Sequence, residues 1–299
     1  MSTQAPPYEG LGKPIRGPRA LTDDWSRFWH LTYNIARNEF KLRFFGSVLG
    51  YVWQLVRPLL LFGVLYVFFT KVAHVNSSHA PGQEHYGAQL LGSIVLFTFF
   101  TEATTGAVRS VVDRENLVRK IQFPRMVIPL SIVLLALFNL ALNLVVVLGF
   151  ALAEGVHPML SWLELPLIVA VLTLFATGIA MLLSALFVSL RDIQPIWDVV
   201  SQILFYASPV IISVETVKEK GAPFLGLSKQ AVLHLYMLNP LATVFQQFRN
   251  AMITPETLNV GQAFGSWTAV LEPLGIVLVV FVLGFWVFNR SAPLVAENL

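Results

Sequence analysis

The sequence contains no cysteine, which excludes disulfide bonds, thiolate metal ligands and thiol catalysis. Charge is also scarce, because Asp, Glu, Lys and Arg make up 12% of the 299 residues, whereas soluble domains carry about 25%. The net charge is only +3 and no basic run with interleaved aromatics lies outside the apolar stretches, which argues against nucleic acid as a partner. By contrast, 56% of the residues are hydrophobic and the mean hydropathy is +0.68. These values predict an all-α membrane protein that crosses the bilayer several times.

Two sequence signals are also missing. Residues 1–24 contain Pro, Gly and charges but no apolar core, so we expect a flexible cytosolic tail there and a single transmembrane domain at 25–299. The phosphate-binding pattern G-x-x-x-x-G-K-[ST] does not occur, and the stretch Gly10-Leu-Gly-Lys13 lacks its spacing. We therefore expect no bound ATP or magnesium in this chain. No metal site is predicted either, because three histidines of one loop fit no compact ligand motif: His74, His79 and His85.

Six apolar stretches approach the ~20 residues that cross a bilayer, although the fifth is short. They lie at residues 49–70, 86–108, 127–153, 164–190, 195–213 and 269–289. Fourteen of the 20 Lys and Arg residues fall on the side that holds both termini, and five fall on the other side. This asymmetry predicts a multi-pass protein of the plasma membrane with both termini in the cytosol.

Three polar or amphipathic segments accompany the spans. Residues 25–45 place Trp25, Phe28 and Trp29 on one helical face, which is typical of a helix in the membrane interface, serving as an anchor or as a docking site. The external loop 214–268 contains apolar stretches too short or too polar to span, which predicts short gate helices. Residues 109–125, RSVVDRENLVRKIQFPR, predict a basic amphipathic helix on the cytosolic side, where a cytosolic partner would touch it.

Four local patterns follow one another along the chain. They are ARNEFKLRFFGSVLGYVWQLVRPLL at 36–60, ENLVRKIQFPRMVIPLS at 115–131, SLRDIQPIWDVVSQILFYASPVIIS at 189–213 and LYMLNPLATVFQQFRNAM at 235–252. In this order they resemble the permease subunit of a type-2 ABC exporter, in the branch that exports polysaccharides and polyol phosphates such as O-antigen, teichoic acid and galactan. The resemblance covers most of the chain after the N-terminal tail.

The resemblance implies a homodimer of non-catalytic permeases around a central conduit, driven by separate cytosolic ABC ATPase subunits that bind the ATP and magnesium. The implied cargo is a lipid-linked polysaccharide that leaves the cytosol. Residues that match the family's coupling helix would contact the ATPase, with a solvated loop as the alternative: Glu115, Asn116, Leu117, Arg119, Lys120, Phe123, Pro124 and Arg125. A second cytosolic contact is expected at Arg37, Lys41, Arg191 and Asp192. In the alternative reading, Asp192 caps the next helix and Arg191 holds a lipid phosphate.

Two charges fall inside predicted spans. Arg57 lies eight residues after Leu49 and Glu102 lies seven residues before Arg109, so both sit about 10–12 Å from the cytosolic end. A lone charge at that depth costs ~3 kcal/mol or more. We therefore expect an ion pair between Arg57 and Glu102, with snorkelling of Arg57 to lipid phosphate as the alternative.

Aromatic side chains with polar tips are the candidates for the substrate path. An aromatic face stacks on a sugar ring without fixing a hydrogen-bond pattern, which suits a sliding polymer. The candidates are Tyr51, Trp53, Tyr66, Phe205 and Tyr206, with an interfacial belt as the alternative for Tyr51 and Trp53.

Two other functions stay open at the level of the sequence. The same permease architecture could export a drug or a small lipid. A membrane glycosyltransferase or polymer ligase is less favoured, because such enzymes need a carboxylate or arginine constellation in an external loop. The external carboxylates here are scattered: Glu84, Glu215, Glu219 and Glu256.

Overall fold

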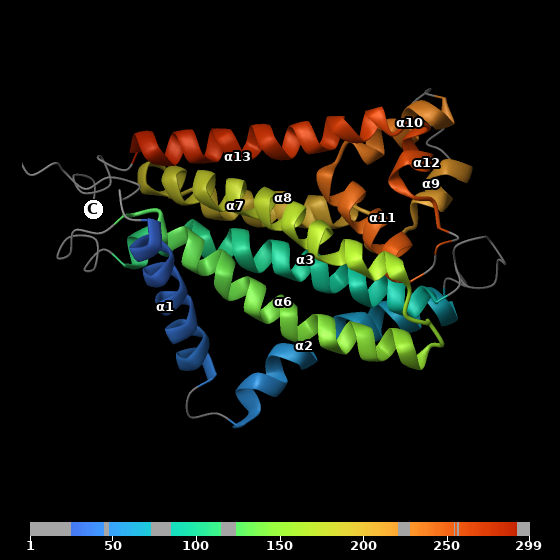
Figure 1. The fold of residues 1–299 in the computed structure, drawn as a ribbon, viewed down its shortest axis with the longest axis horizontal. Helices are drawn as coiled ribbons and strands as arrows, with labels where there is room; N and C mark the ends of the chain where they lie inside the picture. The colour runs from blue at the N-terminus through green and yellow to red at the C-terminus, as the bar shows by residue number, and fades with distance from the viewer. Residues whose placement is uncertain are drawn as a thin grey trace, which may run out of the picture.

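The computed structural model describes residues 25–44, 48–72, 85–114, 124–220, 228–253, 255 and 257–291. These residues form helices joined by turns, and no strand occurs among them, which confirms the predicted all-α class (Figure 1). The expected tail at 1–24 and most of the expected coupling helix, residues 115–123, lie outside the described residues.

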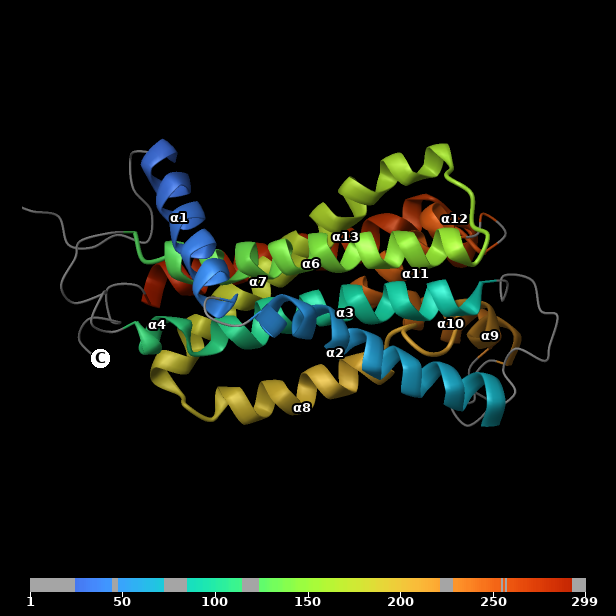
Figure 2. The ribbon, with the colours of Figure 1, turned by 90° about the horizontal axis from the view of Figure 1, so that it is seen from below.

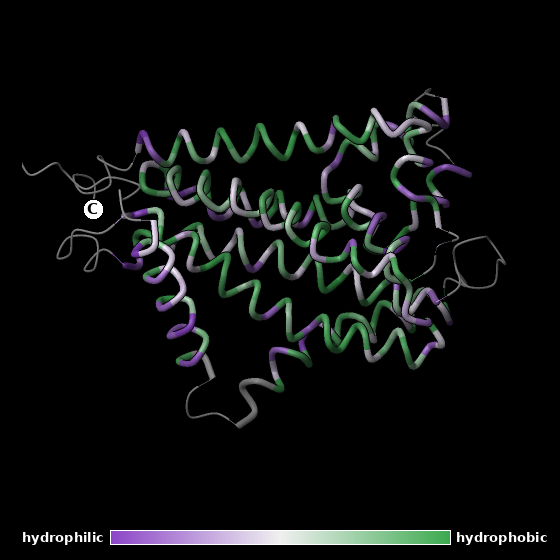
Figure 3. Tube along the Cα trace, in the orientation of Figure 1, coloured by the Kyte–Doolittle hydropathy of each residue, from purple (hydrophilic) through white to green (hydrophobic). Residues whose placement is uncertain are grey.

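Five helices in the described part of the chain are long and apolar enough to cross a membrane. They are α2 (Val48–Val67) with the π-helical turn Phe68–Val72, α3 (Tyr86–Val108), α6 (Val127–Ala153), α7 (Leu165–Ser189) after the 3-10 turn Leu160–Glu164, and α13 (Leu271–Ser291) after the 3-10 turn Thr268–Val270. Apolar residues dominate these helices along their length (Figure 3). Five of the predicted spans are thereby confirmed.

The predicted span at 195–213 is wrong in its extent. The helix found there, α8 (Ile193–Tyr206), has 14 residues, which reach about 21 Å, less than the ~30 Å of hydrocarbon. The chain then turns from residue 207 to 213 before α9 (Val214–Lys220) begins. Pro209 accounts for the break, because it has no backbone N–H and restricts the backbone of the residue before it.

The most buried of the long helices, α3, lies at the centre of the bundle. It packs against α6 and α7 and also against α2 and α8. Figure 2 shows α2 and α8 on one side of α3, and α6, α7 and α13 on the other side. The helices α2 and α8 therefore lie on the same side of α3, where a cavity is lined by all three.

The amphipathic helix α1 (Trp25–Phe44) leaves the bundle at an angle (Figure 1). Phe28 and Ala36 are fully buried on the side that packs toward α6, and Tyr33 meets Phe138 of α6 edge-on at 6.1 Å between ring centroids. Trp25 and Trp29 stay largely exposed. The aromatic side of α1 is thus only partly used for packing, as an interface helix requires.

Four short helices gather at the end of the bundle opposite to α1 and the last turn of α13 (Figure 1). They are α9, α10 (Lys229–Met237), α11 (Pro240–Met252) and α12 (Val260–Phe264). Asn239 caps α11 with Pro240 at its first position, and Asn259 forms a capping box at the start of α12. Short helices are therefore present where the sequence predicts them, and their gating role stays a prediction.

Candidate functional site

Glu102 lies within the span α3 and is held by side chains of two neighbouring helices. Its Oε1 accepts a 2.9 Å hydrogen bond from Nε2 of Gln54 on α2, and its Oε2 accepts a 2.8 Å hydrogen bond from Nδ2 of Asn139 on α6. Hydrogen bonds to both oxygens lower the cost of keeping a carboxylate away from bulk water. They also join α2 and α6 to α3 at this depth.

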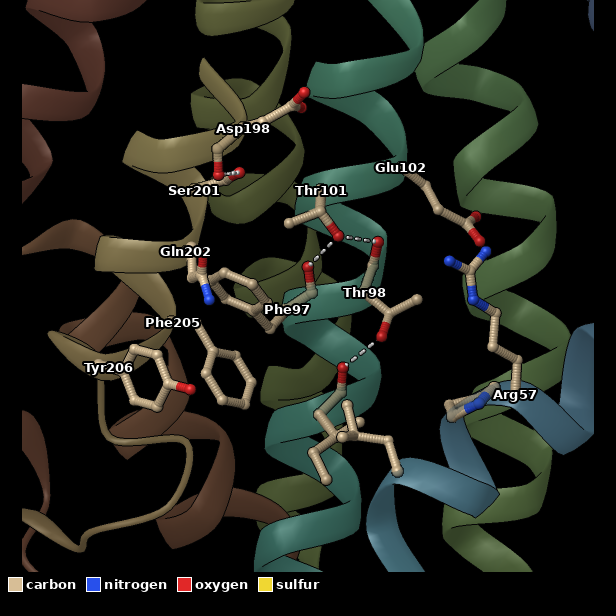
Figure 4. Close-up of a pocket in the computed structure, with 13 residues that line it drawn as sticks. Arg57, Phe97, Thr98, Thr101, Glu102, Asp198, Ser201, Gln202, Phe205 and Tyr206 are labelled. Carbon is tan, nitrogen blue, oxygen red and sulfur yellow. Dashed lines mark hydrogen bonds between the residues drawn. The ribbon is translucent and has the colours of Figure 1, made fainter. Parts of the chain in front are cut away.

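Arg57 lies one helical turn after Gln54 on α2 and lines the same space as Glu102. Figure 4 shows the charged groups of Arg57 and Glu102 pointing toward each other. Among the described residues, however, no salt bridge within 4.0 Å joins them. The expected direct ion pair is therefore not formed in this structure, because amides occupy both oxygens of Glu102. The Arg57 side chain is exposed, so its guanidinium remains available to another anion.

The first of two cavities at this level, the inner cavity, has a volume of about 550 Å³ and lies between α2, α3 and α8 (Figure 4). Its polar lining consists of Arg57, Thr98, Thr101, Glu102, Asp198, Ser201 and Gln202. Its aromatic wall consists of Phe97, Phe205 and Tyr206, with Phe205 at 5.0 Å from Phe97 and 5.3 Å from Tyr206 between ring centroids. Aromatic faces beside hydrogen-bonding groups match a sugar ring, which presents both C–H faces and hydroxyls.

The second cavity, the outer cavity, has a volume of about 800 Å³ and lies between α2, α3 and α6. It shares Arg57, Thr101 and Glu102 with the inner cavity, so these three residues stand in the wall between the two. Its further polar and aromatic lining consists of Trp53, Gln54, Thr105 and Asn139. The intramembrane charges therefore border two cavities rather than a closed ion pair.

The aromatic residues predicted for the substrate path are only partly brought together. Phe205 and Tyr206 line the inner cavity, and Trp53 lines the outer cavity. Tyr66 lines neither of these two cavities, because its ring packs on Phe62 at 5.3 Å between centroids. The side chain of Tyr51 lies outside the described residues. The path itself stays a prediction for all five.

The sequence reasoning missed most of the polar residues of this site, among them Gln54, Asn139 and Asp198. Asp198 carried a usable signal, because it is a carboxylate inside a predicted span, as Glu102 is. The two amides carried a weaker signal, because neutral polar residues are tolerated in spans wherever another helix offers them a partner.

The two ends of the undescribed segment 115–123 are both fixed to the bundle. Arg114 forms a salt bridge with Glu39 of α1 before the segment, and Arg125 is 2% exposed after it. Burial lowers the pKa of the Arg114 and Arg125 guanidinium groups from the ordinary arginine value, because desolvation disfavours their charged form. Of the predicted coupling residues, only Pro124 and Arg125 are described, and their contact with an ATPase stays a prediction.

The residues expected to form a second cytosolic contact are exposed. Arg37 and Lys41 lie on the outer side of α1, and Arg191 and Asp192 lie in the turn between α7 and α8. Asp192 is the N-cap residue of α8, but its side chain makes no capping hydrogen bond. The capping alternative for Asp192 is therefore not realised, and its carboxylate is available to other groups.

Comparison with known proteins agrees with this architecture. The family model described as ABC-2 type transporter matches residues 30–253. The chain is 26% identical over 266 residues to the "O-antigen export system permease protein RfbA" of Klebsiella pneumoniae, covering 89% of this chain and 93% of that protein. It is 27% identical over 219 residues to a protein of the same name from Myxococcus xanthus, covering 73% of this chain and 78% of that protein.

These matches include the residues that hold both cavities and extend over more than half of the chain. The resemblance stated from the sequence is thereby confirmed, and the several apolar helices agree with a multi-pass membrane protein. The chain therefore belongs to the ABC-2 type transporter family.

Proposed function

We propose that this protein is the membrane-spanning subunit of an ATP-driven exporter that moves a lipid-linked polysaccharide from the cytosol across the plasma membrane. The observation that carries the proposal is the inner cavity, where aromatic rings and hydrogen-bonding side chains line one space beside α3. A hydrophobic drug would need few of these polar groups, whereas a glycan uses both kinds of contact. The similarity to two O-antigen export permeases supports the same cargo class.

In the proposed complex, two copies of the permease pair around the conduit, and α8 with the turn at 207–213 forms the fifth of six crossings. The exposed face of α8 is consistent with such a pairing. Both termini face the cytosol, where separate ABC ATPase subunits bind ATP and magnesium and engage the segment at 115–125. The chain itself catalyses no reaction.

The test of the proposed function is ATP-dependent movement of a lipid-linked glycan in proteoliposomes that contain the permease and the ATPase that copurifies with it. Glycan movement that requires both subunits supports the proposal. Movement of a drug or small lipid in place of the glycan would favour the first alternative function. Glycan transfer by the permease without any ATPase would favour a glycosyltransferase or polymer ligase.

The coupling segment gives a second measurable expectation. Replacing Glu115 and Phe123 together with alanine should leave the protein folded in the membrane but lower export, because an apolar plug and its charged flank would be lost from the ATPase contact. Export and ATP hydrolysis are measured together in the reconstituted complex. Glu219→Ala, an exposed carboxylate on α9, serves as the control. Fully coupled activity in the double variant would remove this segment from the mechanism.

The aromatic path residues give a third expectation. Replacing Phe205 and Tyr206, which both line the inner cavity, with alanine should slow polymer export by about fivefold per ring, because each stacking contact is worth ~1 kcal/mol. Basal ATP hydrolysis should stay nearly unchanged. The matched control is Trp286→Ala, which removes an exposed aromatic ring on α13 that lines neither cavity. Export that is insensitive to the double substitution contradicts the assignment of both rings to the path.

A further inference from the structure

Asn139, which lines the outer cavity, has an unused hydrogen-bond acceptor in its side chain. Its side chain is 2% exposed, and its Nδ2 donates to Glu102. Its Oδ1 is buried, and no donor among the described residues reaches it. Buried polar atoms are almost always paired in folded proteins, so an unpaired acceptor beside a cavity of about 800 Å³ indicates that a ligand completes the pair. The ligand must bring a donor such as a hydroxyl group.

Arg57 gives the same cavity a group that binds an anion. Its guanidinium is exposed to the cavity, and no carboxylate lies within salt-bridge distance of it in the described part of the chain. A guanidinium in a site sheltered by helices binds phosphate through paired N–H donors more favourably than it binds water. The exposed ring of Trp53, one turn before Arg57, offers a face on which a sugar ring can stack.

An apolar groove lies on α2 beyond the outer cavity; it shares no lining residue with that cavity and is lined by α2 and the turn Phe68–Val72. Trp53, Arg57, Leu60, Val64 and Val67 follow one another at helical spacing on one side of α2, and the last three line the groove, whose volume is about 550 Å³. Its floor includes Gly63, where a Cβ atom would meet nothing within 4 Å. A polar cavity and an apolar groove along the same side of one helix suit the two parts of an amphiphile.

We propose that the outer cavity and the α2 groove together form a loading site for the cargo lipid, in which Arg57 holds its phosphate, Asn139 accepts from a hydroxyl of its first sugar, and the groove holds its apolar chain. The proposal rests on the proposed function and adds the place where the cargo binds. Glu102 is a positioning residue here, because its two hydrogen bonds fix Gln54 and Asn139 on either side of the cavity. The cargo then lies beside the wall residues Arg57, Thr101 and Glu102, across which the inner cavity begins.

Binding to the full-length permease in nanodiscs of phosphatidylcholine tests the site with four probes. Farnesyl phosphoryl glucose contains all three parts, farnesyl phosphate lacks the sugar, farnesyl glucoside lacks the phosphate, and glucose 1-phosphate lacks the chain. The complete probe should bind about tenfold more tightly than farnesyl phosphate or farnesyl glucoside, as the loss of a buried or charged hydrogen bond predicts. It should also bind more tightly than glucose 1-phosphate, which loses the burial of the apolar chain. Equal binding of the complete probe, farnesyl phosphate and farnesyl glucoside would overturn the site.

Three variants assign the parts of the probe to residues. Arg57→Gln should weaken the probes with phosphate about tenfold and leave farnesyl glucoside unchanged. Asn139→Leu should weaken the probes with sugar and leave farnesyl phosphate unchanged. Gly63→Phe should weaken the farnesyl probes by filling the groove, since a Cβ atom at this position meets nothing within 4 Å. The matched control is Asn143→Leu, one turn along α6 and outside the cavity, which should change no probe.

A second measurement avoids substitutions in the hydrogen-bond network. Because the chain has no cysteine, Thr105→Cys places a single thiol in the wall of the outer cavity. The complete probe should slow its reaction with N-ethylmaleimide at least fivefold, while a cysteine at Thr216 on α9 should react at an unchanged rate. Equal labelling of Thr105→Cys with and without probe contradicts the site. A change of oligomeric state by Gly63→Phe without a change in binding would instead assign the groove to a second copy of the chain.

These outcomes separate the loading site from the proposed function, because binding is measured without ATP or export. Intact binding in a complex that shows no ATP-driven export would overturn the proposed function alone. Export that persists while the four probes bind without discrimination would overturn the loading site alone.

Discussion

Replacing Gly284 with alanine is expected to lower the free energy of unfolding by about 2–3 kcal/mol, the upper range for overpacking a tight contact. A Cβ atom at Gly284 would lie 2.0 Å from the carbonyl oxygen of Gly178 and 2.9 Å from its carbonyl carbon. A Cβ atom at Gly178 would in turn lie 2.7 Å from Cα of Phe281. All of these neighbours are backbone atoms, so no side chain can move aside and α7 and α13 must separate.

This contact matters because α13 has few buried residues and packs chiefly against α7. In lipid, helix association depends on close packing of small residues rather than on the hydrophobic effect. The control is Gly275→Ala in the same helix, where a Cβ atom would meet nothing within 4 Å. Unfolding of both variants in detergent with increasing dodecyl sulfate gives the comparison. Equal stability of Gly284→Ala and Gly275→Ala contradicts the packing argument.

The sequence predicts the long helices well, because a span in lipid requires about 20 consecutive apolar residues and few other segments meet that condition. It fails at 195–213, where most residues are apolar but Pro209 interrupts the backbone. A hydropathy argument counts side chains and does not register a missing N–H. The proline itself was visible, so the break was predictable from backbone chemistry rather than from hydropathy.

For the candidate site, the sequence predicts the depth of the charged residues but not their hydrogen-bond partners. The depth of Arg57 and Glu102 was predictable from residue counts along two helices, and the structure places both beside the same cavities. The partners of Glu102 were not predictable, because they depend on how α2 and α6 are rotated about their axes. Gln54 on α2 and Asn139 on α6 reach the carboxylate, and Arg57, one turn further along α2, does not form a salt bridge with it.

Substitution of Arg249 is expected to lower stability strongly, because this side chain holds the turn that follows α8. The side chain lies on α11 and is 2% exposed. Its Nε donates to Oγ of Ser93 at 3.2 Å, and its Nη2 donates to the carbonyl oxygens of Pro209 and, at 3.1 Å, of Val210.

Replacing Arg249 with methionine is expected to lower the free energy of unfolding by about 3 kcal/mol, since two buried carbonyl groups lose their charged donor. Methionine keeps most of the volume and fills irregular gaps, so the loss reports the hydrogen bonds rather than a cavity. Ser93 is not orphaned, because its hydroxyl also donates to the carbonyl oxygen of Gln89 at 2.8 Å. The stability of Arg249→Lys should lie between that of the unsubstituted protein and that of Arg249→Met, because lysine keeps the charge but not the planar fork of donors.

The matched control is Lys218→Met, which removes an exposed positive charge from the same end of the molecule. Chemical unfolding measures the stability of all three variants, and export in the reconstituted complex measures the functional consequence. Since the turn at 207–213 directly follows Tyr206, whose ring lines the inner cavity, a loosened turn should lower export beyond the loss of folded protein. If Arg249→Met is as stable and as active as Lys218→Met, the buried guanidinium does not hold the broken helix in place.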